Sequence, residues 1–166
     1  MLRLILASSL LLTAFAIPAQ TSYSLPAAEA TTGTRIRPTA AKGARYPYDK
    51  RYDAFTAEER TALKSIWEDM PADDEPPFPA DGMKALMLDI HQTAQRLNLR
   101  GPLVLHAHVG SDGVVNKVDI YKSPDEKFGK YAAIKLGRTH FKPAKCGGQP
   151  CAMEFPLSAN MVMSDR

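Results

Sequence analysis

The sequence has two cysteines, one tryptophan and little excess of charge of either sign. Its 166 residues carry 21 basic and 18 acidic side chains, a formal net charge of +3. Such a balance does not predict the single basic face that nucleic acids require. The candidate for a Gly-rich phosphate-binding loop is Gly147-Gly148, but it is too short and precedes a predicted strand, whereas such a loop precedes a helix. A nucleic-acid partner and a phosphate-binding loop of the helix-start type are therefore not expected.

The spacing of a nucleophilic catalytic site is also missing. Ser111-Asp112 lies in a predicted hairpin turn. A catalytic serine of the nucleophile-elbow type lies instead in a turn between a strand and a helix. Cys146 has a partner cysteine nearby, and no dyad or triad is recognisable by spacing. We therefore expect that the protein is not an enzyme and uses no cofactor, and the sequence identifies no small-molecule substrate.

Only one long apolar run is present, at the amino terminus. Met1-Leu2-Arg3 precedes the fourteen-residue run Leu4 to Ile17. As a helix, this run reaches roughly 21 Å, short of the ~30 Å hydrocarbon core of a bilayer. The pattern predicts a signal peptide over residues 1–19, cleaved after Ala16 or Ala19, and hence an exported protein. The alternative is an uncleaved inner-membrane anchor.

The two cysteines flank a turn in Cys146-Gly147-Gly148-Gln149-Pro150-Cys151. In an oxidising compartment, this pattern predicts a disulfide that closes a hairpin tip. The chain-entropy model gives on the order of 2 kcal/mol for so small a loop. A redox dithiol or half of a metal site is the alternative, but the spacing differs from the C-x-x-C of those sites.

The chain divides into four predicted segments. The signal peptide is followed by a flexible linker over residues 20–52, which is rich in Ala, Thr, Pro and Arg and has no sustained period. Residues 53–76 comprise an accessory helix over 56–70, begun by the Thr56 to Glu59 capping box, and a solvated acidic connection. Residues 77–166 form the main domain.

The main domain alternates helical and strand patterns. A helix capped by Asp81 ends near Leu97, and a second follows the cap pattern at Ser123 to Glu126. Period-two patterns predict strands over 103–109, 114–121 and 153–161. The arrangement predicts an α+β domain.

Two histidines lie on one face of the first predicted strand. His106 and His108 are two residues apart, so both side chains project from the same face, which we expect to be exposed. Such a pair could bind a transition metal with a third ligand from His91, His140 or Asp119. The alternative is a solvent-facing pair with no ligand, and we expect no metal.

Four motifs between Pro77 and Met163 together resemble the carboxy-terminal domain of TonB, the energy transducer of the bacterial envelope. They are Pro77-Phe78-Pro79, the hairpin from Val109 to Val115, Thr139-His140-Phe141-Lys142-Pro143-Ala144, and Gly148-Gln149-Pro150. The resemblance implies a three-stranded antiparallel sheet with helices packed on one face, here with an extra N-terminal helix. It also implies a periplasmic location.

The resemblance further implies a protein-binding module whose last strand pairs with an extended peptide of an envelope protein or outer-membrane receptor. The expected edge comprises Ala152, Met153, Glu154, Phe155, Leu157, Ser158, Ala159 and Asn160. The same edges could pair two copies in a homodimer. A clear anchor and a long Pro-rich spacer are absent, so force transmission is not expected. The alternatives are a small structural subunit or assembly factor of an envelope transport or secretion machine, and a metal-binding periplasmic protein.

Overall fold

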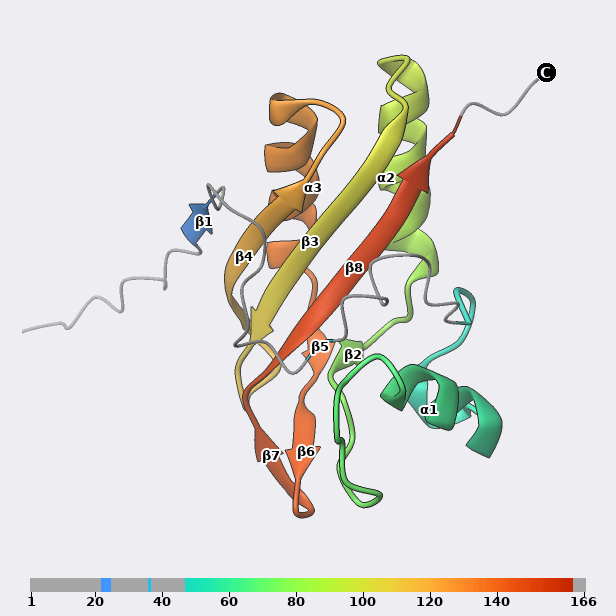
Figure 1. Cartoon of the computed structure of the whole chain (residues 1–166), viewed down its shortest axis with the longest axis vertical. Helices are drawn as coiled ribbons and strands as arrows, with labels where there is room; N and C mark the ends of the chain where they lie inside the picture. Colours follow the sequence, from blue (N-terminus) through green and yellow to red (C-terminus); the bar gives the residue numbers. More distant parts are fainter. Residues whose placement is uncertain (1–21, 25–35, 37–46, 163–166) are drawn as a thin grey trace, which may run out of the picture.

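The computed structural model describes residues 22–24, 36 and 47–162, and its central feature is a four-stranded sheet (Figure 1). The strand order is β1 (Ser22–Ser24), β4 (Val115–Lys122), β3 (Gly101–Val109) and β8 (Met153–Met161). β3 is antiparallel to both β4 and β8, whereas β1 is parallel to β4. The predicted three-stranded antiparallel sheet is confirmed, and β1 extends it with three residues from the predicted linker.

The central strand β3 carries the core of the domain. Its odd-numbered residues Leu103, Leu105, Ala107 and Val109 are each at most 1% exposed. Period-two alternation turns these side chains to one face of the sheet, where they join the apolar cluster that the helices complete. The alternation predicted from the sequence therefore identified the buried face of β3.

Helices α2 (Lys84–Arg96) and α3 (Glu126–Gly137) pack on one face of the sheet (Figure 1). Each buries an apolar stripe, which includes Met87 and Ile90 in α2 and Phe128 and Leu136 in α3. The Tyr131 hydroxyl donates a hydrogen bond to Asp89 Oδ2 at 2.7 Å and so joins the two helices. The α+β class with helices on one face is confirmed.

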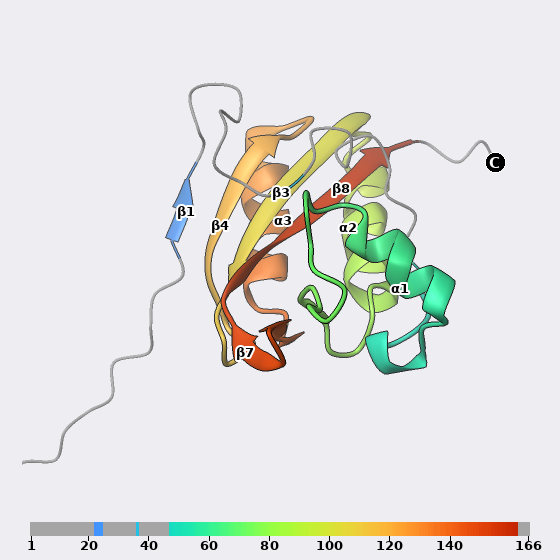
Figure 2. The ribbon, with the colours of Figure 1, turned by 60° about the horizontal axis from the view of Figure 1, so that its bottom comes forward.

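The accessory helix α1 (Ala57–Lys64) is shorter than predicted. Its Thr56–Glu59 capping box is present, but the helix ends at Lys64 and not at residue 70. Beyond it, Trp67 forms an antiparallel bridge with Ile36, and Asp69 has a φ of 52°. The tertiary contacts of Trp67 override the helical period, although Ile66 and Trp67 are buried as the stripe predicted. Figure 2 shows α1 beyond β8, on the side of the sheet away from β1.

Two predicted helix caps differ from the structure. Met83 occupies the cap position of α2, without a side-chain hydrogen bond, while Asp81 pairs instead with Arg51. In α3 the cap is Asp125, whose Oδ1 accepts from the Phe128 amide at 2.9 Å. Ser123 donates to the Asp125 carbonyl, so the predicted cap pattern starts two residues too early.

An aromatic cluster joins the accessory segment to the sheet. The short 3₁₀ helix η2 (Tyr52–Ala54) precedes α1, and β2 (Phe78–Pro79) pairs with β5 (Phe141–Lys142). The Phe78 ring lies 5.0 Å from that of Phe55 and 6.1 Å from that of Phe155, centroid to centroid. Phe78 is completely buried, so these contacts exclude water between the accessory segment and β8.

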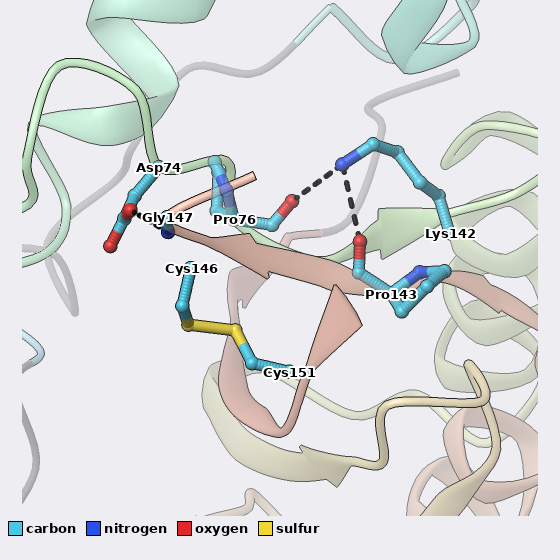
Figure 3. The surroundings of a disulfide bond; sticks show 7 residues. All are labelled: Asp74, Pro76, Lys142, Pro143, Cys146, Gly147 and Cys151. Carbon is cyan, nitrogen blue, oxygen red and sulfur yellow. Dashed lines mark hydrogen bonds between the residues drawn. A yellow bond between two sulfur atoms is a disulfide. The ribbon is translucent and has the colours of Figure 1, made fainter. Parts of the chain in front are cut away.

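The predicted disulfide between Cys146 and Cys151 is confirmed, with a Cα–Cα distance of 5.8 Å (Figure 3). It closes the hairpin of β6 (Ala144–Cys146) and β7 (Gln149–Cys151). Gly147 and Gly148 form its two-residue turn with φ values of 56° and 83°. Positive φ at both central residues is the geometry that a tight hairpin requires, which explains why both are glycine.

In the part of the chain that the structure describes, no helix is long and apolar enough to cross a membrane. The predicted signal peptide over residues 1–19 lies outside the described residues.

Gly113 and Gly148 form a matched pair for a stability test. Their φ values are 80° and 83°, but a Cβ at residue 113 would collide with the Phe141 carbonyl oxygen, whereas nothing lies within 4 Å of one at residue 148. We expect Gly148→Ala to lower the free energy of unfolding by about 1–2 kcal/mol through backbone strain. Gly113→Ala adds overpacking and should cost roughly 2–5 kcal/mol. Urea denaturation followed by circular dichroism measures both, and equal costs would contradict the close approach.

The disulfide predicts a redox-dependent stability. Reduction of the Cys146–Cys151 bond frees a short loop in the unfolded chain, so the free energy of unfolding should fall by about 2 kcal/mol. Thermal melts with and without a thiol reductant measure the change. The Cys146→Ser/Cys151→Ser variant is the control and should have the lower stability without responding to the reductant. A reductant effect on that variant would show that another group is responsible.

Candidate functional site

β8 lies at the end of the strand order among the described residues, as the predicted binding edge requires. Its nine residues pair with β3 from Met153↔Val109 to Met161↔Gly101 without interruption. Ala152 lies between β7 and β8 and is exposed, as is Asn160 near the far end. The predicted edge therefore forms one continuous strand whose two ends are accessible to solvent.

The register determines which backbone groups of β8 face outward. Pro156 lies opposite His106 and has no N–H to donate to it. In an antiparallel ladder, only alternate residues of a strand hydrogen-bond to a given neighbour. The ladder bonds to β3 therefore fall on the odd-numbered residues of β8, and the even-numbered residues turn their backbone groups outward. The Glu154 carbonyl agrees with this, because it accepts a hydrogen bond from Trp67 Nε1 at 3.2 Å.

The side chains of the predicted edge have different surroundings. Phe155 and Leu157 are buried in the core, where Phe155 contacts the rings of Phe78 and Phe141. Of the other predicted residues, the two at the ends are exposed, Ala152 and Asn160, and four are half-buried: Met153, Glu154, Ser158 and Ala159. Only these six can present side chains to another molecule.

The outer edge of β8 already has contacts within the chain. The Trp67 indole covers the Glu154 carbonyl, which is one of the outward acceptors. A strand that added along the whole edge would therefore exchange this existing contact for a new one. Asn160, near the carboxyl end of β8, is exposed and is one of the even-numbered residues whose backbone groups face outward.

A cavity of about 390 Å³ lies beside the first residues of β8, and we name it the Trp67 pocket. Trp67, Met70 and Met153 contribute apolar walls. Three carboxylates also line it: Glu68, Asp74 and Glu154. An apolar cavity with only acidic charged groups fits an apolar or positively charged side chain. The sequence could not indicate this pocket, because Trp67 and Glu154 are 87 residues apart.

His106 and His108 lie in a polar cluster across β4, β3 and β8. His108 Nε2 lies 2.7 Å from Asp119 Oδ2, and both histidines have a ring nitrogen 3.5 Å from a Glu154 carboxylate oxygen. His106 is 7% exposed and its ring centroid lies 4.4 Å from that of Tyr121. The expectation that this face is exposed is therefore wrong for His106, because neighbouring strands supply packing partners.

The candidate metal ligands are brought together only in part. Asp119 reaches His108, whereas His91 lies on α2 with Nδ1 2.8 Å from the Met87 carbonyl oxygen. His140 lies near Gly113, at the hairpin end of the sheet. Residues 22–24, 36 and 47–162 contain no group of three or more His, Cys, Asp or Glu side chains arranged to hold a metal ion.

The disulfide hairpin packs against the acidic connection (Figure 3). Gly147 donates its amide to Asp74 Oδ1 at 2.8 Å, and Glu75 and Lys145 exchange two backbone hydrogen bonds of 2.9 and 2.8 Å. Asp74 is 9% exposed. The prediction of a solvated acidic connection is therefore wrong for Asp74 and Glu75, because the Gly147 amide binds the first carboxylate and two lysines of the hairpin region pair with the second. Asp73 is exposed, as predicted.

Burial raises the pKa of Glu75, but Lys142 and Lys145 outweigh it and hold the pKa below its usual value. Glu75 therefore remains ionised near neutral pH, as its two lysine ion pairs require. This ionised carboxylate lies at the bridge between the acidic connection and the hairpin.

Residues 92–160 match the family model described as Gram-negative bacterial TonB protein C-terminal. The match runs from the second half of α2 to Asn160 in β8 and so includes the whole predicted binding edge. No curated protein matches the chain. Domains of this family are periplasmic, non-enzymatic modules that interact with envelope or outer-membrane proteins. Residues 92–160 are therefore similar in sequence to the C-terminal domain of TonB, and the antiparallel sheet with helices on one face agrees with the fold that this similarity implies.

Proposed function

We propose that the protein binds an extended segment of an envelope or outer-membrane partner along the outer edge of β8. The observation that carries this proposal is the outward direction of the even-numbered backbone groups at the end of the sheet. Main-chain hydrogen bonds along such an edge supply affinity, and side-chain pockets supply specificity. The hydrogen bond from Trp67 to the Glu154 carbonyl supports the proposal, because it shows that a donor outside the sheet can bind an outward carbonyl of β8.

The Trp67 pocket supplies the specificity in this proposal. It adjoins Met153 and Glu154, so a partner segment on β8 would place one side chain into it. The pocket combines apolar walls with the carboxylates of Glu68, Asp74 and Glu154. A partner segment with a lysine, an arginine or a large apolar residue at that position fits this chemistry.

The edge also limits the partner. Pro156 has no N–H, and the Glu154 carbonyl has an existing partner, Trp67 Nε1, that an added strand would replace. Such an exchange reduces the net gain from a new hydrogen bond. We therefore expect a reversible interaction, strongest at the Asn160 end and at the Trp67 pocket. Export through residues 1–19 and a linker over 20–52 are parts of the same proposal.

A crosslinking experiment with two substitutions at one position tests the edge. A photo-crosslinking amino acid at Ala152, beside the Trp67 pocket, should form an adduct with an envelope protein in cells. Asn160→Pro removes an outward N–H and should weaken the association about fivefold, the effect of one hydrogen bond. Asn160→Ala keeps that N–H and should leave the adduct yield unchanged. Circular dichroism confirms that both variants are folded.

Leu88, which is exposed on α2, is the matched control site for the crosslinker. It lies on a helix behind the sheet, so it should give little adduct. Equal yields from both sites, or equal yields from Asn160→Pro and Asn160→Ala, would reject binding along β8. An adduct of twice the mass of the chain would show that the partner is a second copy of this protein and not another envelope protein.

A further inference from the structure

A second cavity, of about 500 Å³, lies beside the accessory segment, and we name it the Tyr52 cavity. Its walls come from η2, α1, β2, β5 and β6, and it shares no lining residue with the Trp67 pocket. Its charged residues are four cations, Arg51, Arg60, Lys142 and Lys145, and two carboxylates, Asp53 and Glu75. Asp81 pairs with Arg51 outside the cavity, so cations still exceed carboxylates when Asp81 is counted.

Two of these cations lie against the ring of Tyr52. The Lys142 Nζ atom is 4.3 Å from the ring centroid, and the Arg60 guanidinium carbon is 5.3 Å from it. Tyr52 is 5% exposed, so the ring holds both positive charges at the inner wall of the cavity. Burial raises the pKa of the Tyr52 hydroxyl, with Glu75 adding to the rise and Arg60 opposing it, so the hydroxyl remains a donor.

Two buried donors on residues that line the cavity have no acceptor among the described residues. Tyr52 Oη and Arg60 Nε are buried, and neither has a hydrogen-bond partner there. The other contact of the Arg60 guanidinium is a neutral one, from Nη2 to the Asp53 carbonyl oxygen at 3.1 Å. Buried donors are ordinarily paired, so an adjacent pair without an acceptor is a feature that requires an explanation.

Glu75, one of the two carboxylates of the cavity, is already paired with two lysines. Glu75 Oε2 lies 2.8 Å from Lys142 Nζ, and Glu75 Oε1 lies 3.4 Å from Lys145 Nζ. Burial lowers the pKa of Lys142, Glu75 opposes this, and the charges of Lys145 and Arg60 lower it further. One half-buried carboxylate thus pairs with two lysines, and Arg60 has no ion pair within the described part of the chain.

We propose that the Tyr52 cavity binds an oxyanion, the phosphate or carboxylate group of a ligand, through Arg60, Lys145 and the Tyr52 hydroxyl. A guanidinium presents several donors in a planar fork that matches the oxygens of such a group, and a phenol adds one more. Lys145 also lines the cavity and its side chain is half-exposed, so an anion can reach it from solvent. The site is separate from β8 and does not depend on the proposed strand addition.

Titration of the purified protein with inorganic phosphate tests the site, followed by amide chemical shifts at constant ionic strength. We expect saturable shifts at residues around Tyr52 and Lys142. Arg60→Gln should weaken binding at least about tenfold, because it removes a charge-assisted donor. Tyr52→Phe keeps the ring but removes the hydroxyl, and should weaken binding about threefold to tenfold.

The matched control is Lys130→Gln, which removes one positive charge from the exposed surface of α3. It should leave phosphate binding unchanged. A parallel titration with acetate distinguishes the two sources: equal saturation by acetate indicates a carboxylate ligand, and saturation by phosphate alone indicates a phosphate ligand. The absence of saturable shifts with both anions would overturn the proposal. So would equal weakening by Lys130→Gln and Arg60→Gln, since that result shows general charge attraction.

Discussion

The contact between the rings of Phe78 and Phe155 is the interaction on which the arrangement of both candidate sites depends. Phe155 belongs to β8, and Phe78 belongs to the segment that follows the acidic connection. Because Phe78 also packs on Tyr52 and Phe55, it holds η2 and the start of α1 against the end of the sheet. Trp67 reaches the edge of β8 and Tyr52 forms its cavity because this aromatic cluster positions the whole accessory segment.

The Glu75–Lys145 bridge separates two cavities of opposite charge. Asp74 and Cys146 line the Trp67 pocket, whereas their chain neighbours Glu75 and Lys145 line the Tyr52 cavity. The boundary between the two cavities therefore lies at the Glu75–Lys145 bridge. Charges of opposite sign so close together would attract and neutralise one another if the backbone could move. The two backbone hydrogen bonds of the bridge and the disulfide hairpin restrict that movement.

Local patterns predicted the features that depend on near neighbours in the sequence. The alternation in β3, the Thr56–Glu59 capping box and the Cys146–Cys151 hairpin each involve residues within a few positions of one another. The resemblance to a family added the fold and suggested β8 as the edge. Errors arose where a distant residue determined the outcome. Trp67 leaves the helical pattern for partners on β8, and Asp74 is covered by the hairpin rather than by water.

Local sequence patterns could not predict the two candidate sites either, because their residues are distant from one another in the sequence. Tyr52, Arg60 and Lys142 meet only after the chain has folded, and no spacing or motif relates the first two to the third. The outward direction of the β8 backbone follows from the position of Pro156 in the register, which requires the strand pairing to be known. A proline in the predicted strand indicated an edge, and the pairing determined which of its residues face outward.

The position of Trp67 has a practical consequence. It is the one tryptophan of the chain, and its indole N–H donates to the backbone of β8 at the edge of the sheet. Anything that displaces this bond changes the polarity around the strongest ultraviolet fluorophore in the molecule. The protein therefore carries an intrinsic optical reporter, whose emission wavelength registers whether the bond between Trp67 and the Glu154 carbonyl is intact, without any attached dye.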